Sequence, residues 1–431
     1  MNQVHLIRSL FQNEGLQKTA VTPIKPAQMI YGTVKRFYPN QTALIQMGNL
    51  KVTAHVQADI SEAAGYWFEV QPHQGDELYL KVIKGNESGS GQPDAASVLQ
   101  HLQLPETKRN QQLIEFFLSK NLPLMKEQMR EAASWMNSKT DFSKASAVME
   151  FMIKNGLPFT KEVFQSFLAV QESQSFTSQL EQASEYLGNP KLASFQSIEP
   201  LKQMIGRILD NGDQLQPVPS AGEAKSMLKG LVESLGLEYE REIKIRLAGN
   251  LERPAESLDS LKPLLMSAMK ELKSDGKALE PILHRLTGMQ LISQDYNGPI
   301  QYILMQLPIS FGGDSTDLTI QWSGKKTDKG QLDPNHCRIV FYLELKRIHD
   351  TVIDMLVQNK VIQVTIMNET KGMESAVAMF RPILKEKLKS IGYQLSGIKV
   401  IESYEKNNKE SSQKNPVDFI QQFYQGVDLK V

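Results

Sequence analysis

The side chains best suited to chemistry in this chain are its histidines and its single cysteine. His336 and Cys337 are neighbours, and an imidazole beside a thiol is the arrangement that activates a nucleophilic cysteine. Neighbouring residues on a strand point to opposite faces, so His336 is not placed to take the proton of Cys337. We therefore expect Cys337 to act as a small apolar side chain and not as a nucleophile.

Metal binding is the second chemistry that these residues could support. Two histidines on one helix face are three or four residues apart, and a thiolate zinc site needs several cysteines. The chain has one cysteine, and no two of its histidines have that spacing. We expect no catalytic residue, no metal and no cofactor. The seven histidines are His5, His55, His73, His101, His284, His336 and His349.

Carboxylate pairs and phosphate-binding loops give equally weak signals. Asp350 and Asp354 would share a strand face about 13 Å apart, too far to share a proton, and we expect them to be solvated. The segment "GNESGSG" has no following Lys-Ser/Thr pair, and "FGGD" fits a hairpin turn. An enzymatic function is the third hypothesis, and it requires the fold to bring distant histidines and acidic groups into one cleft.

The composition bounds the class of protein. The 431 residues include 48 Lys+Arg and 48 Asp+Glu, so no net charge draws the chain to nucleic acid or anionic lipid. Its length suggests two to four domains. A single cysteine forms no intramolecular disulfide, and a chain without disulfides fits the reducing cytoplasm. We find no Sec-type signal and no 18-residue apolar run, and we expect neither a small-molecule substrate nor a membrane span.

The elements that would position these residues begin with a predicted small β-barrel at residues 28–84. Short alternating segments are separated by turn signals such as Pro39-Asn40 and Gly48-Asn49. Residues 1–27 precede it as a helix or tail, and residues 85–97 follow as a Gly- and Ser-rich linker. We expect a structural or peptide-binding barrel. The alternative is a nucleic-acid-associated adaptor that uses Lys35, Arg36, Phe37, Tyr38 and Lys51.

A duplicated motif marks the predicted helical domain at residues 98–209. "FFLSKNLPLMKEQ" begins at Phe116, and "FMIKNGLPFTKEV" begins thirty-five residues later at Phe151. Because proline disfavours helix in the residue before it, each copy predicts a helix, a bend at Leu-Pro and a second helix. We interpret the copies as a helical spacer or docking surface. A linker at 210–222 and a helical region at 223–294 follow, with Gly236 and Gly288 as expected helix ends.

From residue 299 the hydrophobic period changes to two, which predicts an α+β domain at residues 299–402. A hairpin is followed by three strands, and Asn359-Lys360 fits a tight turn because asparagine tolerates positive φ. A helix with Val377, Phe380, Leu384, Leu388 and Ile391 on one face crosses the sheet before a last strand. Residues 403–431 form a linker and an amphipathic tail. The fold class is thus α+β multidomain: a small N-terminal β-barrel, a helical middle region and a C-terminal mixed sheet with one crossing helix.

Residues 338–401 resemble the C-terminal domain of the flagellar hook-length control family, in particular its Gram-positive relatives. The resemblance is carried by the strands ending in "VIDMLVQNKVIQVTI", the helix "FRPILKEKLKSIGYQL" and the closing "IKV". Pro382 lies inside that helix, where the family tolerates proline. The resembling stretch, residues 338–401, covers about 65 residues.

The resemblance implies a function without catalysis. Such proteins contact the cytoplasmic domain of a flagellar type III export-gate protein and switch the class of substrate that is exported, and many are exported themselves. The apolar residues of the resembling segment could form this contact or the core of the domain, and we favour the core. They are Phe341, Ile353, Met355, Ile362, Val364, Ile366, Leu384 and Leu388.

Overall fold

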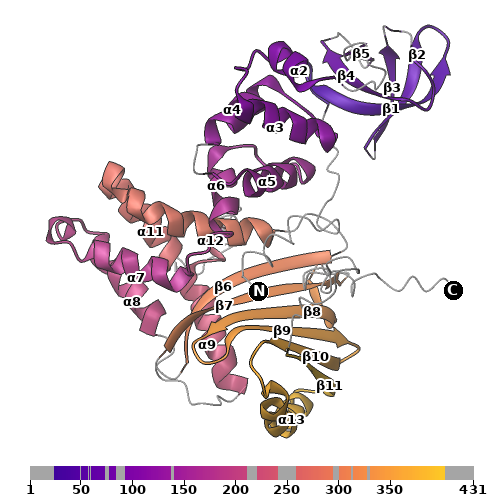
Figure 1. The fold of residues 1–431 in the computed structure, drawn as a ribbon. Helices are drawn as coiled ribbons and strands as arrows, with labels where there is room; N and C mark the ends of the chain where they lie inside the picture. The colour runs from indigo at the N-terminus through magenta and orange to yellow at the C-terminus, as the bar shows by residue number, and fades with distance from the viewer. Residues whose placement is uncertain are drawn as a thin grey trace, which may run out of the picture. The chain divides into compact units, whose positions relative to one another are not determined.

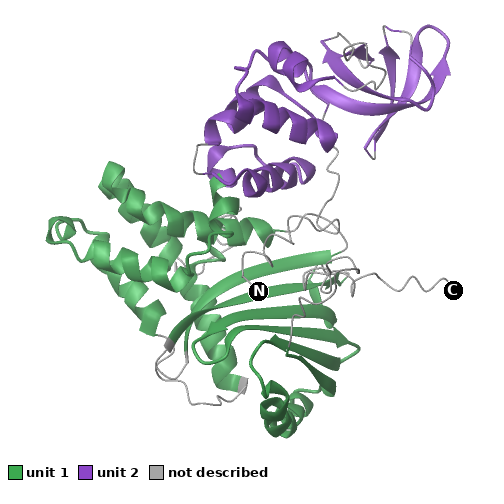
Figure 2. Ribbon diagram, in the orientation of Figure 1, with its two compact units in different colours: residues 1–10, 165–431 green, residues 11–164 purple. Residues whose placement is uncertain are grey.

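The computed structural model describes residues 24–48, 50–56, 58, 60–72, 77–83, 93–136, 140–210, 221–240, 259–294, 300–311, 314–327 and 331–402. The chain divides into two compact units (Figure 2). We call the unit that ends at residue 164 the first unit (purple, unit 2 in the key) and the unit that continues from residue 165 the second unit (green, unit 1 in the key). Most of the predicted N-terminal helix or tail (1–27), most of both linkers and the tail at 403–431 lie outside the described residues.

The first unit contains the predicted barrel. Five strands close in the order β1-β2-β3-β5-β4, with β3 and β5 parallel. This is a five-stranded Greek-key barrel, the architecture that includes the OB fold. Alternate residues point inward and form its core, among them Val34, Ile45, Phe68 and Leu80. The strands are β1 (Met29–Tyr38), β2 (Thr42–Met47), β3 (Leu50–Val56), β4 (Gly65–Gln71) and β5 (Leu78–Val82).

Helices follow the barrel and form the bends predicted from the duplicated motif. Asn121 and Gly156 occupy the same place in the two copies, and both have left-handed φ, 52° and 63°. The next residue in each copy donates its N–H back to the helix, Leu122 to Phe117 and Leu157 to Met152, both at 2.9 Å. This is a Schellman cap followed by proline. The helices are α2 (Ala95–His101), α3 (Lys108–Ser119), α4 (Lys126–Trp135), α5 (Phe142–Lys154) and α6 (Lys161–Ala169).

A third copy of this bend lies between α2 and α3 and was missed in the sequence. Gln103 has φ 55°, and the N–H of Leu104 bonds to the carbonyl of Leu99 at 2.9 Å. Pro105 then follows, as proline follows in the other two copies. The sequence comparison missed this copy because glutamine rarely adopts left-handed φ, so only Leu-Pro is shared.

The two original copies use the residue after proline differently. Leu124 exchanges two backbone hydrogen bonds of 2.9 Å with Met29 at the start of the barrel. Phe159, its counterpart, packs against Trp135, with ring centroids 4.9 Å apart. The first copy therefore fixes the helices to the barrel, and the second fixes the helices to one another.

The second unit is built on a mixed six-stranded sheet in the order β11-β10-β9-β8-β7-β6. Asn359 and Lys360, with φ 50° and 66°, form the predicted tight turn between β9 and β10. The last two strands are parallel and joined by α13, which crosses the sheet as expected. The strands are β6 (Ile300–Phe311), β7 (Asp314–Lys326), β8 (Leu332–Leu345), β9 (His349–Gln358), β10 (Val361–Asn368) and β11 (Gln394–Ile401), and the helix is α13 (Met373–Ser390).

Opposite faces of this sheet carry different helices. The side chain of Gln306 on β6 bonds to Arg285 of α12, whereas Leu388 of α13 packs on the face that bears Ile362 and Val364. Figure 1 shows α13 at the β11 edge of the sheet and α7, α8, α11 and α12 on the β6 side, and α9 packs against α8 and α11. These others are α7 (Phe176–Leu187), α8 (Ile198–Leu209), α9 (Ala221–Leu235), α11 (Leu261–Leu272) and α12 (Glu280–Ile292), with short 3-10 turns η2 (Pro190–Leu192) and η5 (Lys273–Leu279).

A buried polar network holds α7 and α12 on the sheet. The carboxylate of Asp317 on β7 accepts hydrogen bonds from the N–H groups of Phe176 and Thr177 at the start of α7. The guanidinium of Arg285 bonds to Gln306 at 2.6 Å and to the carbonyl of Gln174 at 2.7 Å. Burial lowers the pKa of Arg285 to about 10, although Asp317 opposes the shift.

One of the two glycines expected to end helices does so. Gly236 follows α9 with φ 73°, as a left-handed cap requires. The prediction for Gly288 was wrong, because this residue lies inside α12. A β-carbon there would come within 2.2 Å of the carbonyl oxygen of Ser166. Close helix packing, and not a turn, therefore requires glycine at that position.

Candidate functional site

The side chains of His336 and Cys337, neighbours on β8, lie in different surroundings. His336 is exposed and contacts Asp333, with 2.7 Å between Nδ1 and Oδ2. Cys337 is buried in the apolar cluster of the sheet, and burial raises the pKa of its thiol. A thiol with a raised pKa holds little thiolate, so this pair is not an activated nucleophile.

The two aspartates of β9 are not the solvated pair that we expected. Arg338 donates two hydrogen bonds to Asp354, of 2.8 and 2.7 Å, in a largely buried bidentate pair. Asp350 accepts a hydrogen bond of 2.9 Å from the hydroxyl of Tyr342. Each carboxylate is therefore paired across the sheet with β8, where a cross-strand partner stabilises it. Their role is structural.

A serine and a histidine far apart in the sequence meet between α6 and α12. The Ser166 hydroxyl lies 3.3 Å from Nδ1 of His284. Ser166 is only 1% exposed, so a substrate cannot reach its oxygen. A nucleophile needs access as well as a base. The contact is thus part of the packing between these helices.

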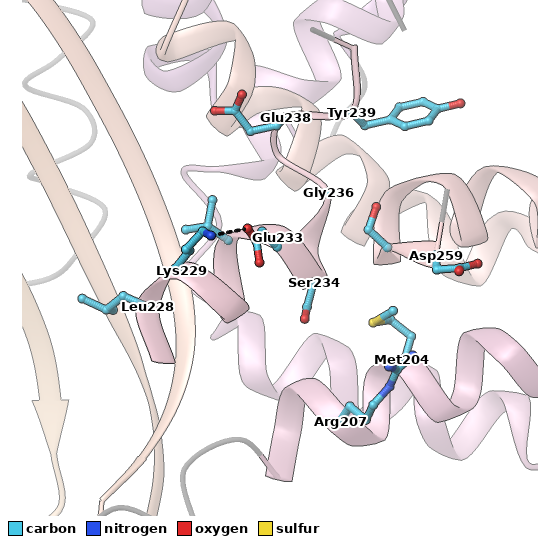
Figure 3. Close-up of a pocket in the computed structure, with 12 residues that line it drawn as sticks. Met204, Arg207, Leu228, Lys229, Glu233, Ser234, Gly236, Glu238, Tyr239 and Asp259 are labelled. Atoms are coloured by element: carbon cyan, nitrogen blue, oxygen red, sulfur yellow. Dashed lines mark ion pairs between the residues drawn. The ribbon is translucent and has the colours of Figure 1, made fainter. Parts of the chain in front are cut away.

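A pocket of about 730 Å³ opens beside α8 and α9. It is lined by charges of both signs, including Arg207, Glu238 and Asp259, and by the exposed ion pair of Lys229 with Glu233. In Figure 3 the carboxylates of Glu238 and Asp259 point in different directions, and Tyr239 points outward. Catalytic groups must converge on one reacting atom, and these groups do not. The lining of this pocket therefore indicates no class of reaction.

A buried lysine lies next to this pocket. Lys262 of α11 is 3% exposed and pairs with Glu240 and Gln290. The Gln290 amide also donates to the carbonyl of Leu237 at 2.8 Å. Burial lowers the pKa of Lys262, and the hydrogen bond and charge of Glu240 oppose the shift. Because Leu237 and Glu240 directly follow α9, the bonds from Lys262 of α11 and Gln290 of α12 fix the end of α9 to both helices.

No group of three or more His, Cys, Asp or Glu side chains in the described ranges could hold a metal ion. None of the described helices is long and apolar enough to cross a membrane.

Most of the residues proposed from the sequence for partner binding lie between α13 and the sheet face that it covers. Ile362 and Val364 are buried there, and Ile353, Met355, Ile366 and Leu388 pack against them. Phe341 and Leu384 are half-buried. The structure therefore places six of these eight side chains in the apolar cluster between the sheet and α13.

The exposed apolar surface of this domain lies one layer further out, on α13. In this 18-residue helix only Met373 is buried. Met379, Phe380 and Ile383 are 71%, 56% and 43% exposed, and Ile391 just beyond the helix is 56% exposed. Large apolar side chains gathered at a surface mark a site for a protein or membrane contact. We take this surface as the candidate functional site.

Comparison with known proteins adds one relative. The uncharacterized protein YlqG of Bacillus subtilis (strain 168) is 22% identical, over 86% of this chain and 89% of its own length. No protein-family model and no solved structure matches the chain. The coverage means that the similarity to YlqG extends into both compact units.

The residues chosen from the sequence lie in the layer beneath the exposed surface of α13, and two of the exposed residues were missed. Phe380 and Ile391 were assigned to the inward face of the helix, whereas Met379 and Ile383 were not considered. The sequence did contain a sign of this exposure, because the apolar residues of this helix spread over a wider arc than one sheet face can cover. An apolar arc wider than the surface available to it predicts that part of the arc is exposed.

Proposed function

We propose that this protein is a non-enzymatic interaction protein that contacts the cytoplasmic domain of a flagellar type III export-gate protein and influences substrate switching. The domain at residues 299–402 makes the contact. The protein acts in the cytoplasm, and export by the flagellar type III route is part of the same proposal. No small molecule is transformed.

Two lines of support combine in this proposal. The segment 338–401 resembles the C-terminal domain of hook-length control proteins, and its described strands and helix follow the order that the resemblance implies. The single observation that carries an interaction role is the exposed apolar surface of α13, with Met379 as its most exposed member. Exposing such side chains to water is unfavourable unless a partner covers them.

The direct test is binding between the full-length chain and a purified export-gate cytoplasmic domain. We expect a dissociation constant in the micromolar range, as for transient signalling contacts, measured by isothermal titration calorimetry. An equal amount of an unrelated protein serves as the control for nonspecific binding. No heat of binding at concentrations of about 100 μM would contradict the proposal.

A second candidate function uses the barrel. Its Greek-key architecture includes the OB fold, and Lys35, Arg36, Tyr38 and Lys51 are exposed on it. A nucleic-acid-associated adaptor would bind single-stranded oligonucleotides with an affinity that falls steeply with salt. Fluorescence anisotropy of a labelled oligothymidine tests this, with Lys35→Gln/Arg36→Gln as the weakened variant. Absence of binding at low salt would remove this candidate.

A further inference from the structure

Four large apolar side chains are exposed along one side of α13 and just beyond its end. Met379, Phe380 and Ile383 are exposed on the helix, and Ile391 is exposed directly after it. At about 100° per residue, the three helix residues fall within one arc of about 100°. At 1.5 Å per residue, the row from Met379 to Ile391 is about 18 Å long. We call these four residues the α13 stripe.

The charges of α13 lie mostly away from this stripe. By the same angular count, Lys385 and Lys389 fall on the far side of the helix. Lys387 lies beside the stripe, and Glu386 next to it carries the opposite charge. The stripe therefore presents an apolar row with little net charge. It suits an occupant whose contact face is apolar and uncharged.

The chain contains such a face among the residues that follow β11. The stretch "NPVDFIQQFYQG", residues 415–426, begins with asparagine and proline and ends with glycine, which predicts a helix of about ten residues. Such a helix is about 15 Å long, close to the length of the α13 stripe. Its apolar residues fall in one arc of about 160°, and its aspartate and three glutamines fall in the opposite arc. We call residues 415–426 the C-terminal segment. Its apolar residues are Val417, Phe419, Ile420, Phe423 and Tyr424.

The place where the chain leaves the sheet brings this segment within reach of the stripe. Glu402, directly after β11, accepts a hydrogen bond of 3.1 Å from the N–H of Glu374 in the first turn of α13. Met379 is five residues further along the helix, which is about 8 Å along its axis. The twelve residues 403–414 connect Glu402 to the segment. A polar chain of this length spans about 20 Å on average and about 40 Å at most, so the segment can reach the stripe of its own chain.

We propose that the C-terminal segment docks as a helix on the α13 stripe of its own chain. Its apolar arc covers Phe380 and Ile383, and its glutamines face water. A short linker gives an effective concentration of about 1 mM, so a contact with a dissociation constant of about 0.1 mM keeps about nine chains in ten closed. The docking itself does not require the proposed function. Its consequence rests on that function: the export-gate domain binds the stripe only after the segment has left it.

Docking is tested by the reactivity of a thiol placed on the stripe of the full-length chain. Met379→Cys should react with N-ethylmaleimide about ten times more slowly than the same thiol combined with Phe419→Ser/Phe423→Ser, because the docked segment covers it. Lys385→Cys, on the far side of the same helix, is the matched control and should react equally fast with either segment. Cys337 adds little background because it is buried. Equal rates for Met379→Cys with the two segments would overturn the inference.

The same measurement distinguishes docking within one chain from docking on a second copy. Docking within one chain does not depend on protein concentration, so the protection of Met379→Cys should stay constant between about 1 and 100 μM. Protection that grows with concentration would make the segment of a second copy the occupant and overturn the inference. Circular dichroism verifies that Phe419→Ser/Phe423→Ser retains the fold.

Binding of the export-gate cytoplasmic domain tests the consequence for the proposed function. Phe419→Ser/Phe423→Ser should bind the domain about tenfold more tightly than the unchanged chain, because no segment has to be displaced. Gln421→Ser/Gln425→Ser, on the polar face of the same segment, is the control and should leave the affinity unchanged. If the domain binds neither chain while Met379→Cys is still protected, the proposed function falls and the docking stands. If the domain binds both chains equally and Met379→Cys is not protected, the docking falls and the proposed function stands.

Discussion

At the scale of single residues, the buried charges of the second unit determine how helices attach to one another and to the sheet. Lys262 and Arg285 are both buried cations, and each is held by side-chain amides and a carboxylate nearby. Burying a charge is costly unless it is paired and hydrogen-bonded. Removing one partner of such a network should therefore cost more than removing an exposed charge.

Lys262 should make the stability of the second unit depend on pH in the alkaline range. Its folded pKa is below the unfolded value of 10.5, so between these values the unfolded state binds more protons. Stability therefore rises with pH across that interval. Lys262→Met should flatten this rise, whereas Lys270→Met, an exposed lysine on the same helix, should not. Urea unfolding at several pH values tests this, and an unchanged slope in Lys262→Met would contradict it.

Asp317 should stabilise the unit through both α7 and Arg285. Its carboxylate caps the start of α7 by bonding to the N–H of Thr177 at 2.9 Å, and its charge favours the buried guanidinium. Asp317→Asn keeps the shape and loses the charge, so we expect a loss of about 2 kcal/mol in the free energy of unfolding. Asp210→Asn, an exposed residue after α8, is the control. Equal effects of the two changes would show that the buried charge does not matter.

At the scale of elements, the sequence predicted local structure well where the signal itself was local. Leu-Pro fixed the bends of the duplicated unit, because proline restricts the residue before it and cannot continue a helix. Alternation predicted the strands, and Asn359-Lys360 predicted their turn. Gly288 was misread because the reason for its glycine is the approach of Ser166, which lies far away in the sequence.

Alanine substitution should distinguish a glycine that a bend requires for its left-handed φ from a glycine inside a helix. Gly156 has φ 63°, and Gly156→Ala should lower the free energy of unfolding by about 1 kcal/mol. Gly206 lies inside α8 with open space around its Cα, so Gly206→Ala should raise that free energy by about 0.5–1 kcal/mol. Urea unfolding measures both. A stabilising Gly156→Ala would be incompatible with a left-handed cap in solution.

At the scale of the whole molecule, the sequence did not show which helices belong to which unit. The range 98–209 was interpreted as a single helical domain, but the boundary between the compact units falls between residues 164 and 165. Periodicity reveals that a helix has an apolar face and not what covers that face. For α7 the partner is the sheet, through Asp317, a contact that spans 140 residues to Thr177. No local pattern encodes such a distance.

Each unit has an apolar core of its own, and tryptophan reports on each separately. Trp67 and Trp135 lie in the first unit, and Trp322 lies in the second. A Trp322→Phe chain therefore reports on the first unit, and a Trp67→Phe/Trp135→Phe chain reports on the second. Adding Asp317→Asn should lower the urea midpoint of the second reporter and leave the first unchanged, because the lost contacts lie within one core. If both midpoints shift together by the same amount, the two units unfold as one.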